Sequence, residues 1–488
     1  MSITYHYGID FGTTNSSVVA LLVADGDEPK EVKFGDDEGR PMPSLIAIDR
    51  ETGEVHSGRE ARDGRNELAE TCVIVQSVKS LLDDEGWSIK IGEETWDAEK
   101  VTTEVFKALK ANVEADDSQA LSRATVAIPI GFGAAKRATV RRAARQADIE
   151  IESFVSEPTA AFFANASDLM GFEHVVIFDW GGGTLDVSVL ENRAGVLTEL
   201  ATSGMQVGGD DIDERLARKI HARVALDKDR RDLAFDDMPA ADRDKLLTRA
   251  ERAKRALSED ESTRVSLNSY GEMGSFNIEI KDGWFAAIVS DIVQAAMDCM
   301  DIALLDAGMT TDDMVDCVVM VGGTSNLVPL QELMEGRFGE DRLFFPDETV
   351  WSISRGASRL SLNPGSYKAA QEVDIVLADG SLFPLLKKGV QVAGWSKSVD
   401  LGVVDSTEEY RIVFTGSRDI DDSPDHYHVI GVSAKGFLQE TLHLETVIDE
   451  NMVFVATMAS SHAPDETKAT WYYGGLKLCY SLKECGCR

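Results

Sequence analysis

Two stretches of the chain, residues 7–23 and 174–190, share one design. Each begins with a short apolar run that ends in an aspartate, Asp10 or Asp179. A turn of small and hydroxyl-bearing residues follows, and then a second apolar run. Short apolar runs on both sides of a turn predict a β-hairpin. Two such hairpins, far apart in the sequence, predict a duplicated domain with two lobes.

The turns of these hairpins have the composition of an anion-binding loop. Small residues at a tip let backbone N–H groups approach an anion closely. The turn residues are Gly12, Thr13, Thr14 and Asn15 in the first hairpin and Gly181, Gly182, Gly183 and Thr184 in the second.

Three carboxylates accompany these turns: Asp10, Asp179 and Asp186. A carboxylate repels phosphate, but it can hold a hydrated Mg²⁺ that binds phosphate oxygens. The three aspartates therefore predict a metal–polyphosphate between the hairpins. The alternative is a pair of ordinary hairpins that use Asp and Gly for turn geometry, and the repetition of the motif argues against it.

A third element points to the same ligand. The apolar run 316–321 is followed by Gly322, Gly323 and Thr324, and then by a helical pattern over 329–336. The order strand, glycine turn, helix admits a phosphate or a ribose. The motif is neither GxxxxGK[ST] nor GxGxxG, which argues against P-loop and Rossmann folds.

Strand and helix patterns alternate up to residue 360, which predicts an α/β domain over 1–360. From residue 372 the apolar residues alternate with a period of two, which predicts an antiparallel β module over 372–465. We expect a linker over 361–371 and a C-terminal tail over 466–488. The expected strands of the first domain are 6–9, 17–23, 124–128, 174–178, 186–190 and 317–321, and the expected helices are 102–115, 134–148, 158–166, 211–226, 245–257 and 286–307.

The net negative charge of the chain argues against two classes of binding partner, nucleic acids and anionic membranes. The chain has 85 acidic and 49 basic side chains in 488 residues, a net charge of −36. Such a surface repels nucleic-acid backbones and anionic membranes, so we expect neither as a partner.

No secretory signal or bilayer-length apolar run is visible, which predicts a soluble cytoplasmic protein. Cys479, Cys485 and Cys487 allow a metal or redox patch, but tail cysteines without such a role are the favoured interpretation, because no histidine or second cysteine pair lies nearby.

Four segments carry a resemblance to a known family: residues 10–16 (DFGTTNS), 156–161 (SEPTAA), 179–186 (DWGGGTLD) and 321–325 (VGGTS). They are similar to motifs of the 70-kDa heat-shock chaperones, the DnaK-type ATPases. The resemblance runs from about residue 3 to 360. It implies a two-lobed, actin-like (duplicated ribonuclease H-like) ATPase domain. More weakly, it implies that residues 372–465 form a small antiparallel β-sandwich that binds substrate.

The resemblance also implies roles for individual residues. Lys79, Glu157 and Thr184 match catalytic positions, where a lysine would offset charge on the γ-phosphate and a glutamate would orient water. Asp10, Asp179 and Asp186 match the magnesium positions. The nucleotide-binding positions are matched by Gly12, Thr13, Thr14, Asn15, Gly181, Gly182, Gly183, Thr184, Gly208, Gly209, Asp210, Glu251, Lys254, Ser258, Gly322, Gly323, Thr324 and Asp347.

The implied activity is Mg²⁺-dependent hydrolysis of ATP to ADP and phosphate, coupled to binding of unfolded or extended polypeptide. A co-chaperone or exchange factor is a further implied partner. The basic run around Arg137 and Arg141 is either a docking surface or a solvated helix face. The family's apolar linker is not recognisable at 366–372, and too few residues follow Ser461 for its helical lid. The alternatives are an actin-like structural ATPase that polymerises and a small-molecule kinase of the same superfamily.

Overall fold

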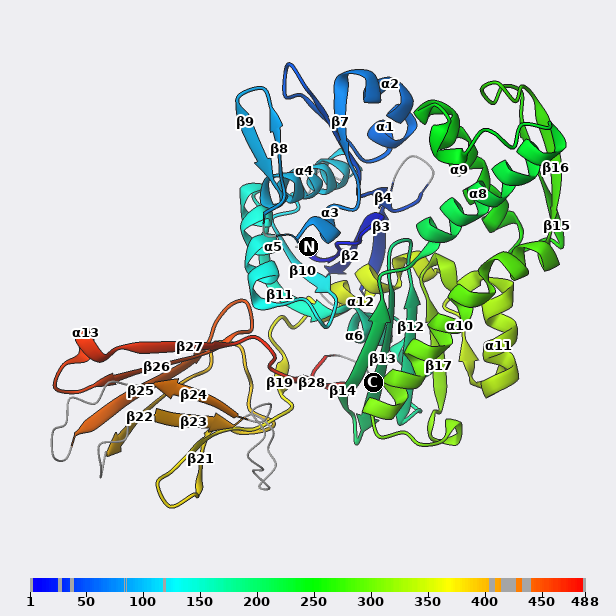
Figure 1. Ribbon diagram of the computed structural model, residues 1–488. Helices are drawn as coiled ribbons and strands as arrows, with labels where there is room; N and C mark the ends of the chain where they lie inside the picture. The colour runs from blue at the N-terminus through cyan, green and yellow to red at the C-terminus, as the bar shows by residue number, and fades with distance from the viewer. Residues whose placement is uncertain are drawn as a thin grey trace.

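The structure is a computed structural model. It describes residues 3–24, 29–35, 39–82, 84, 86–116, 120–402, 409–413, 427–431 and 440–485. Figure 1 shows a mixed α/β body that contains residues up to about 360, with a β module beside it.

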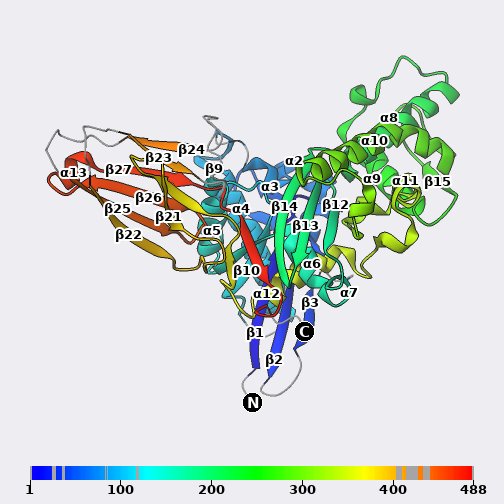
Figure 2. The same cartoon turned by 90° about the horizontal axis from the view of Figure 1, so that it is seen from below.

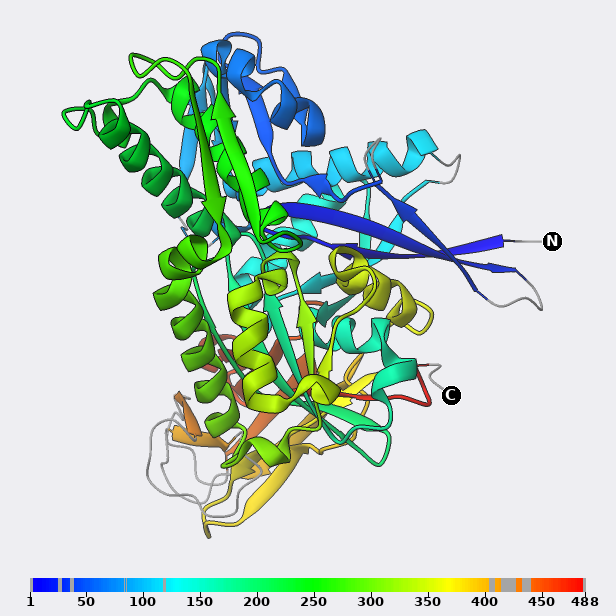
Figure 3. The ribbon, with the colours of Figure 1, turned by 90° about the vertical axis from the view of Figure 1, so that its right-hand side faces the viewer.

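The first large sheet contains the N-terminal hairpin. Its strand order is β11-β10-β1-β2-β3, and β4 pairs with β2 off this path. β1 runs parallel to β10 and antiparallel to β2. Figure 3 shows the β1–β2 hairpin, in dark blue, projecting past the rest of the fold. The strands are β1 Ile3–Asp10, β2 Asn15–Ala24, β3 Lys30–Phe34, β4 Met42–Pro43, β10 Arg123–Ile128 and β11 Glu150–Ser156.

The second large sheet contains the other hairpin and has the order β18-β17-β12-β13-β14-β28-β19. β12 runs parallel to β17 and antiparallel to β13, so its first five strands repeat the pattern of the first sheet. β17 is buried on both faces, as an apolar parallel strand should be. The strands are β12 His174–Trp180, β13 Leu185–Arg193, β14 Val196–Met205, β17 Cys317–Val321, β18 Leu343–Phe344, β19 Tyr367–Ala369 and β28 Leu478–Ser481.

Helices cover these sheets, and small sheets extend the upper part of the body (Figure 1). All the expected strands and helices of residues 1–360 are present, with ends shifted by a few residues. The main helices are α4 Ala98–Asp116, α5 Ala134–Gln146, α6 Glu157–Ala164, α8 Gly209–Asp227, α9 Ala240–Ala256, α10 Asp282–Asp306, α11 Val328–Phe338 and α12 Ser352–Leu360. The shorter helices are α1 Gly58–Asp63, α2 Arg65–Thr71, α3 Val78–Leu81, α7 Ala166–Leu169 and α13 Pro464–Thr467, and the smaller strands are β5 Ile46–Asp49, β6 Val55–Ser57, β7 Cys72–Val75, β8 Ser88–Ile91, β9 Glu94–Asp97, β15 Ser262–Leu267 and β16 Phe276–Lys281.

The β module has two four-stranded antiparallel sheets, β21-β20-β23-β24 and β22-β25-β26-β27. In β25 buried and exposed residues alternate, which follows from the two-residue period of a strand. The apolar alternation that predicts this module includes Tyr410, Ile412 and Phe414, and Phe414 lies outside the described residues. The strands are β20 Val373–Val376, β21 Leu382–Leu386, β22 Ser396–Gly402, β23 Glu409–Val413, β24 Tyr427–Gly431, β25 Thr441–Ile448, β26 Phe454–Ser460 and β27 Ala469–Tyr473.

Two expectations about the chain ends of the module are wrong. The segment expected to be a linker, 361–371, contains β19, and the expected tail, 466–488, contains β27 and β28. β28 lies between β14 and β19 in the second large sheet, in the order labelled in Figure 1. Figure 2 shows a red strand of the C-terminal segment beside β14. The chain thus adds β19 to this sheet before it enters the β module, and it adds β28 when it returns to the α/β body. Cys479 and Cys485 are buried here, and Cys487 lies outside the described residues.

Candidate nucleotide site

The tip of the first hairpin is held from outside by a serine. The backbone N–H of Ser44 donates to Thr14 O at 2.9 Å, and its hydroxyl donates to Gly12 O at 2.9 Å. A Cβ at Gly12 would lie 2.0 Å from Asn15 O, so this turn can close only around a glycine. The two hydrogen bonds from Ser44 therefore fix the backbone of the turn that carries Thr13 and Thr14.

The tip of the second hairpin touches the first. Asp179 pairs with Asp186 across the strands, and Gly181 N–H donates to Thr184 O at 2.9 Å. A Cβ at Gly182 would lie 2.3 Å from Thr14 Oγ1. The absence of side chains at this tip is what lets the two hairpins meet.

Two further loops join the same point. Gly322 has φ +82°, and a Cβ there would lie 2.4 Å from Trp180 O. The hydroxyl of Thr324 donates to Gly181 O at 2.7 Å. From the start of α8, Gly209 N–H donates to Gly181 O at 3.1 Å and Asp210 N–H donates to Gly182 O at 2.8 Å. The predicted loops at 12–15, 181–184, 208–210 and 322–324 are thus brought together.

The two side chains expected to act on water form a buried ion pair. Lys79 lies on the short helix α3, and Glu157 is the first residue of α6. The Nζ of Lys79 donates to Glu157 Oε1. Only 9% of Lys79 and 7% of Glu157 is exposed. A buried pair is held by its mutual attraction, so each residue fixes the position of the other.

The site carries more negative than positive charge. Burial, with the negative charge of Glu157 next, raises the pKa of Asp10 to about 7 although Lys79 lowers it. Burial and the same glutamate raise the pKa of Asp186 to about 6. Burial and neighbouring carboxylates raise the pKa of Asp179 well above its ordinary value. A cation would relieve this repulsion.

The surroundings that disfavour the charged form of these aspartates favour the charged form of Lys79. Burial by itself lowers the pKa of this ammonium group, but Glu157, Asp10 and Asp186 attract the positive charge more strongly, so its pKa is raised. Lys79 therefore remains protonated. Its single positive charge does not balance the carboxylates around it.

The donor set fits magnesium held through water. Carboxylate oxygens are hard ligands that Mg²⁺ accepts, and the ion keeps several of its waters. The carboxylate oxygens of Asp10, Asp179 and Asp186 do not all lie within 4.8 Å of one another. These three residues would therefore hold such an ion partly through water molecules.

Four other residues that match nucleotide-binding positions are less closely gathered: Glu251, Lys254, Ser258 and Asp347. Lys254, on α9, donates to Gly209 O and to Asp213 Oδ2, both at 2.8 Å. Glu251 pairs with Arg62 at 3.2 Å. Ser258 lies beyond the end of α9, and Asp347 is exposed in a turn. Of the four, Lys254 alone is hydrogen-bonded in the described structure to one of the four predicted loops.

Sequence reasoning missed three residues around the site. Ser44 holds the first hairpin tip, Asp213 holds Lys254, and Arg62 pairs with Glu251. Each acts through a partner distant in the sequence. The only signal at Asp213 was its position near the start of the predicted helix 211–226, close in sequence to Gly209 and Asp210.

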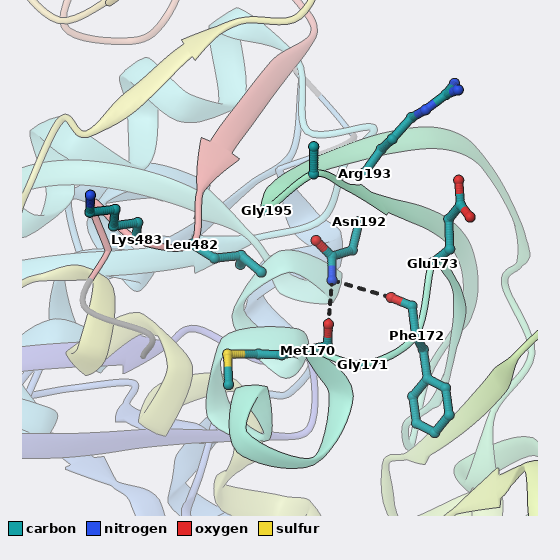
Figure 4. Close-up of a pocket in the computed structure, with 10 residues that line it drawn as sticks. Met170, Gly171, Phe172, Glu173, Asn192, Arg193, Gly195, Leu482 and Lys483 are labelled. Carbon is teal, nitrogen blue, oxygen red and sulfur yellow. Dashed lines mark hydrogen bonds between the residues drawn. The ribbon is translucent and has the colours of Figure 1, made fainter.

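A cavity of about 540 Å³ lies elsewhere, at the opposite end of β12 and β13 from their turn (Figure 4). Asn192 lines this cavity, and its Nδ2 donates to Met170 O at 2.9 Å and to Phe172 O at 3.2 Å. None of the predicted site residues lines it. Beside it, Glu173, His174 and Glu191 are the only described residues grouped closely enough to ligate one metal ion directly.

Two findings bear on the whole chain. No helix among the described residues is long and apolar enough to cross a bilayer. The family model described as Hsp70 protein matches residues 56–359, which is more than half of the 488 residues. This match includes the segments around Lys79, Glu157, Gly181–Thr184 and Gly322–Thr324. The chain therefore belongs to the Hsp70 protein family, whose members share an actin-like ATPase fold and an ATP-binding, chaperone-type function.

Proposed function

We propose that this chain hydrolyses ATP to ADP and phosphate with Mg²⁺ and couples the reaction to binding of extended polypeptide. The observation that carries the ATPase proposal is the meeting of the hairpin tips beside the buried Lys79–Glu157 pair. The matching strand order of the two large sheets supports a duplicated, two-lobed ATPase domain.

Each residue has a role that follows from its place. Backbone N–H groups at the hairpin tips and the hydroxyls of Thr13, Thr14 and Thr184 bind phosphate oxygens. Glu157 accepts a hydrogen bond from the attacking water and orients it in line with the γ-phosphate. Lys79 stabilises the charge on the transferring phosphoryl group. Bound Mg²⁺ supplies further charge neutralisation of the triphosphate.

The first test is turnover by variants of the full chain. Lys79→Ala and Thr184→Ala each remove a group that acts on the transferring phosphoryl group, so we expect kcat to fall at least about 100-fold. ATP binding, measured by calorimetry, should remain within several-fold of wild type. Lys90→Ala, at an exposed position on β8, is the matched control. Wild-type turnover in both site variants contradicts the assigned chemistry.

The polypeptide part of the proposal rests on the β module. Its two four-stranded antiparallel sheets suit the expected β-sandwich over 372–465, in which strand edges or loops hold extended apolar segments. We expect the full chain to bind a fluorescent extended apolar peptide, and ATP to change the affinity, as measured by anisotropy. Nucleotide-dependent light scattering without peptide binding would instead favour the polymerising ATPase.

A further inference from the structure

We propose that Glu199, on β14, is a positioning residue for ATP hydrolysis that fixes the first turn of α6 and so the carboxylate of Glu157. The inference rests on the proposed ATPase function. Among the described residues no hydrogen bond joins Glu199 to Glu157. Glu199 instead accepts hydrogen bonds from Ser156, the residue before Glu157, and from Thr159, two residues after it.

The contacts converge on one oxygen atom. The hydroxyl of Ser156 donates to Glu199 Oε1, and the hydroxyl of Thr159 donates to the same oxygen at 2.6 Å. Ser156 is also the N-cap of α6, because its Oγ accepts from Thr159 N–H at 3.3 Å. The carboxylate thus ties the N-cap to the first turn, and the backbone that carries Glu157 lies between the two contacts.

The backbone of β14 is irregular at this residue. Val189 pairs with Ala201, whereas Leu190 pairs with Glu199, so Leu200 is an extra residue in the ladder. A bulge turns neighbouring side chains away from the regular alternation of a strand. Here the irregularity immediately adjoins the carboxylate that reaches α6.

Burying the carboxylate of Glu199 costs desolvation free energy, because the charged group loses contact with water. Burial raises the pKa of Glu199 above its ordinary value, while the hydroxyls of Ser156 and Thr159 and the charge of Lys477 lower it. An apolar side chain would avoid the desolvation penalty but could not accept the two hydrogen bonds. Its negative charge also lies near the start of α6, where the helix dipole favours an anion.

The geometry connects this contact to the reaction. Glu157 is the first residue of α6 and forms the ion pair with Lys79. A movement of that first turn would shift the carboxylate that orients water and the ammonium group paired with it. Misplacing a reacting group by about 1 Å can reduce a rate by about 100-fold. Loss of Glu199 should therefore reduce turnover more than nucleotide affinity.

The test compares three variants of the full chain with wild type. Glu199→Leu removes the acceptor, and we expect kcat to fall roughly ten- to 100-fold while the Kd for ADP stays within about twofold. Glu199→Gln keeps an acceptor oxygen and should restore kcat to within about threefold of wild type. Glu191→Gln, on the neighbouring strand β13, is the matched control and should leave kcat unchanged.

A second substitution tests the contact from the other side. Thr159→Val keeps the shape of the side chain and removes the donor, so it should lower kcat by a similar factor. Adding it to Glu199→Leu should cause little further loss, because both remove one interaction. If Glu199→Leu does not fold, unchanged kcat in Thr159→Val overturns the inference, as does unchanged kcat in a folded Glu199→Leu. Absence of turnover in wild type would instead overturn the proposed function.

Discussion

Asp213 shows how a single residue can support the candidate site through another side chain. It lies on α8 and pairs with Lys254, which also donates to Gly209 O. Its Oδ1 is buried and has no hydrogen-bond partner among the described residues. Burial raises the pKa of Asp213 to about 7, although Lys254 lowers it. Stability should therefore depend on the protonation of this side chain.

The sign of that dependence follows from proton linkage. Between its ordinary pKa of 3.8 and about 7, Asp213 is protonated in the folded chain and ionised in the unfolded chain. The folded state binds the extra proton, so the contribution of Asp213 to the unfolding free energy falls as pH rises through this window, by up to about 1.4 kcal/mol per pH unit.

Urea unfolding of nucleotide-free protein at pH 5, 6 and 7 can measure this contribution. We expect wild type to lose stability relative to Asp213→Asn as pH rises, because asparagine does not titrate. Asp236→Asn is the control, since Asp236 is exposed and its pKa is lowered by Arg218. A stability difference between wild type and Asp213→Asn that does not change with pH would contradict the assignment.

For single residues, the sequence predicts those site residues that belong to a recognisable pattern of neighbours in the chain. Asp10, Asp179 and Asp186 stand at strand ends next to glycine turns, a pattern visible within ten or so residues. Lys79 and Glu157 have no local signal and were found only through the resemblance to a family. Ser44, Asp213 and Glu199 act through residues distant in sequence, so no pattern around them indicates their partners.

Helices and strands, like single residues, are predictable from the sequence where their signal is local and are missed where it depends on distant partners. The hairpins β1–β2 and β12–β13 are predicted because each strand pairs with its neighbour in the chain. β28 has four residues, and its partners are β14 and β19, both far away in the sequence. A strand so short has no detectable period, and its place depends on the edge that β14 offers.

The packing of α12 on α6 can be tested by one methyl group. A Cβ at Gly356, on α12, would lie 1.7 Å from the backbone oxygen of Ala160 on α6. Gly356→Ala must therefore push the two helices apart, and we expect it to destabilise the chain by about 1–3 kcal/mol, measured as a lower thermal midpoint.

A glycine-to-alanine substitution at a helix position with open space should instead raise the stability of the chain. A Cβ at Gly336, on α11, meets nothing within 4 Å. Gly336→Ala should stabilise the chain by about 0.5–1 kcal/mol, because alanine loses less backbone entropy in a helix. Equal midpoints for the two variants would show that α6 and α12 are not in close contact.

At the scale of the molecule, α5 joins the α/β body to the β module. Arg137 donates to Gly474 O at 3.0 Å, and Arg141 donates to Asn451 Oδ1 at 3.0 Å. Arg145 pairs with Glu450 at 2.7 Å. Both Arg137 and Arg141 are buried, so the interpretation of this run as a solvated helix face is wrong for them. The basic run instead docks the protein's own β module.

Arg141 is the centre of this contact and provides its sharpest test. It also donates to Ile151 O and Glu450 O, and its guanidinium lies 5.0 Å from the ring centre of Phe154. Arg141→Ala leaves two carbonyls without their donor, each at a cost of about 1–3 kcal/mol. We expect amides of the turn 449–453 to exchange hydrogen at least about tenfold faster, measured by mass spectrometry.

The adjacent residue separates docking from a general loss of positive charge. Arg142 is on the same helix and exposed, and it pairs with Glu99 at 2.8 Å within the α/β body. Arg142→Ala removes the same charge without touching the β module, so exchange in the turn 449–453 should change by less than about twofold. Equal acceleration in both variants would mean that charge, and not the buried contact, holds the module. Acceleration in Arg141→Ala alone requires that α5 and the β module separate when this one side chain is lost.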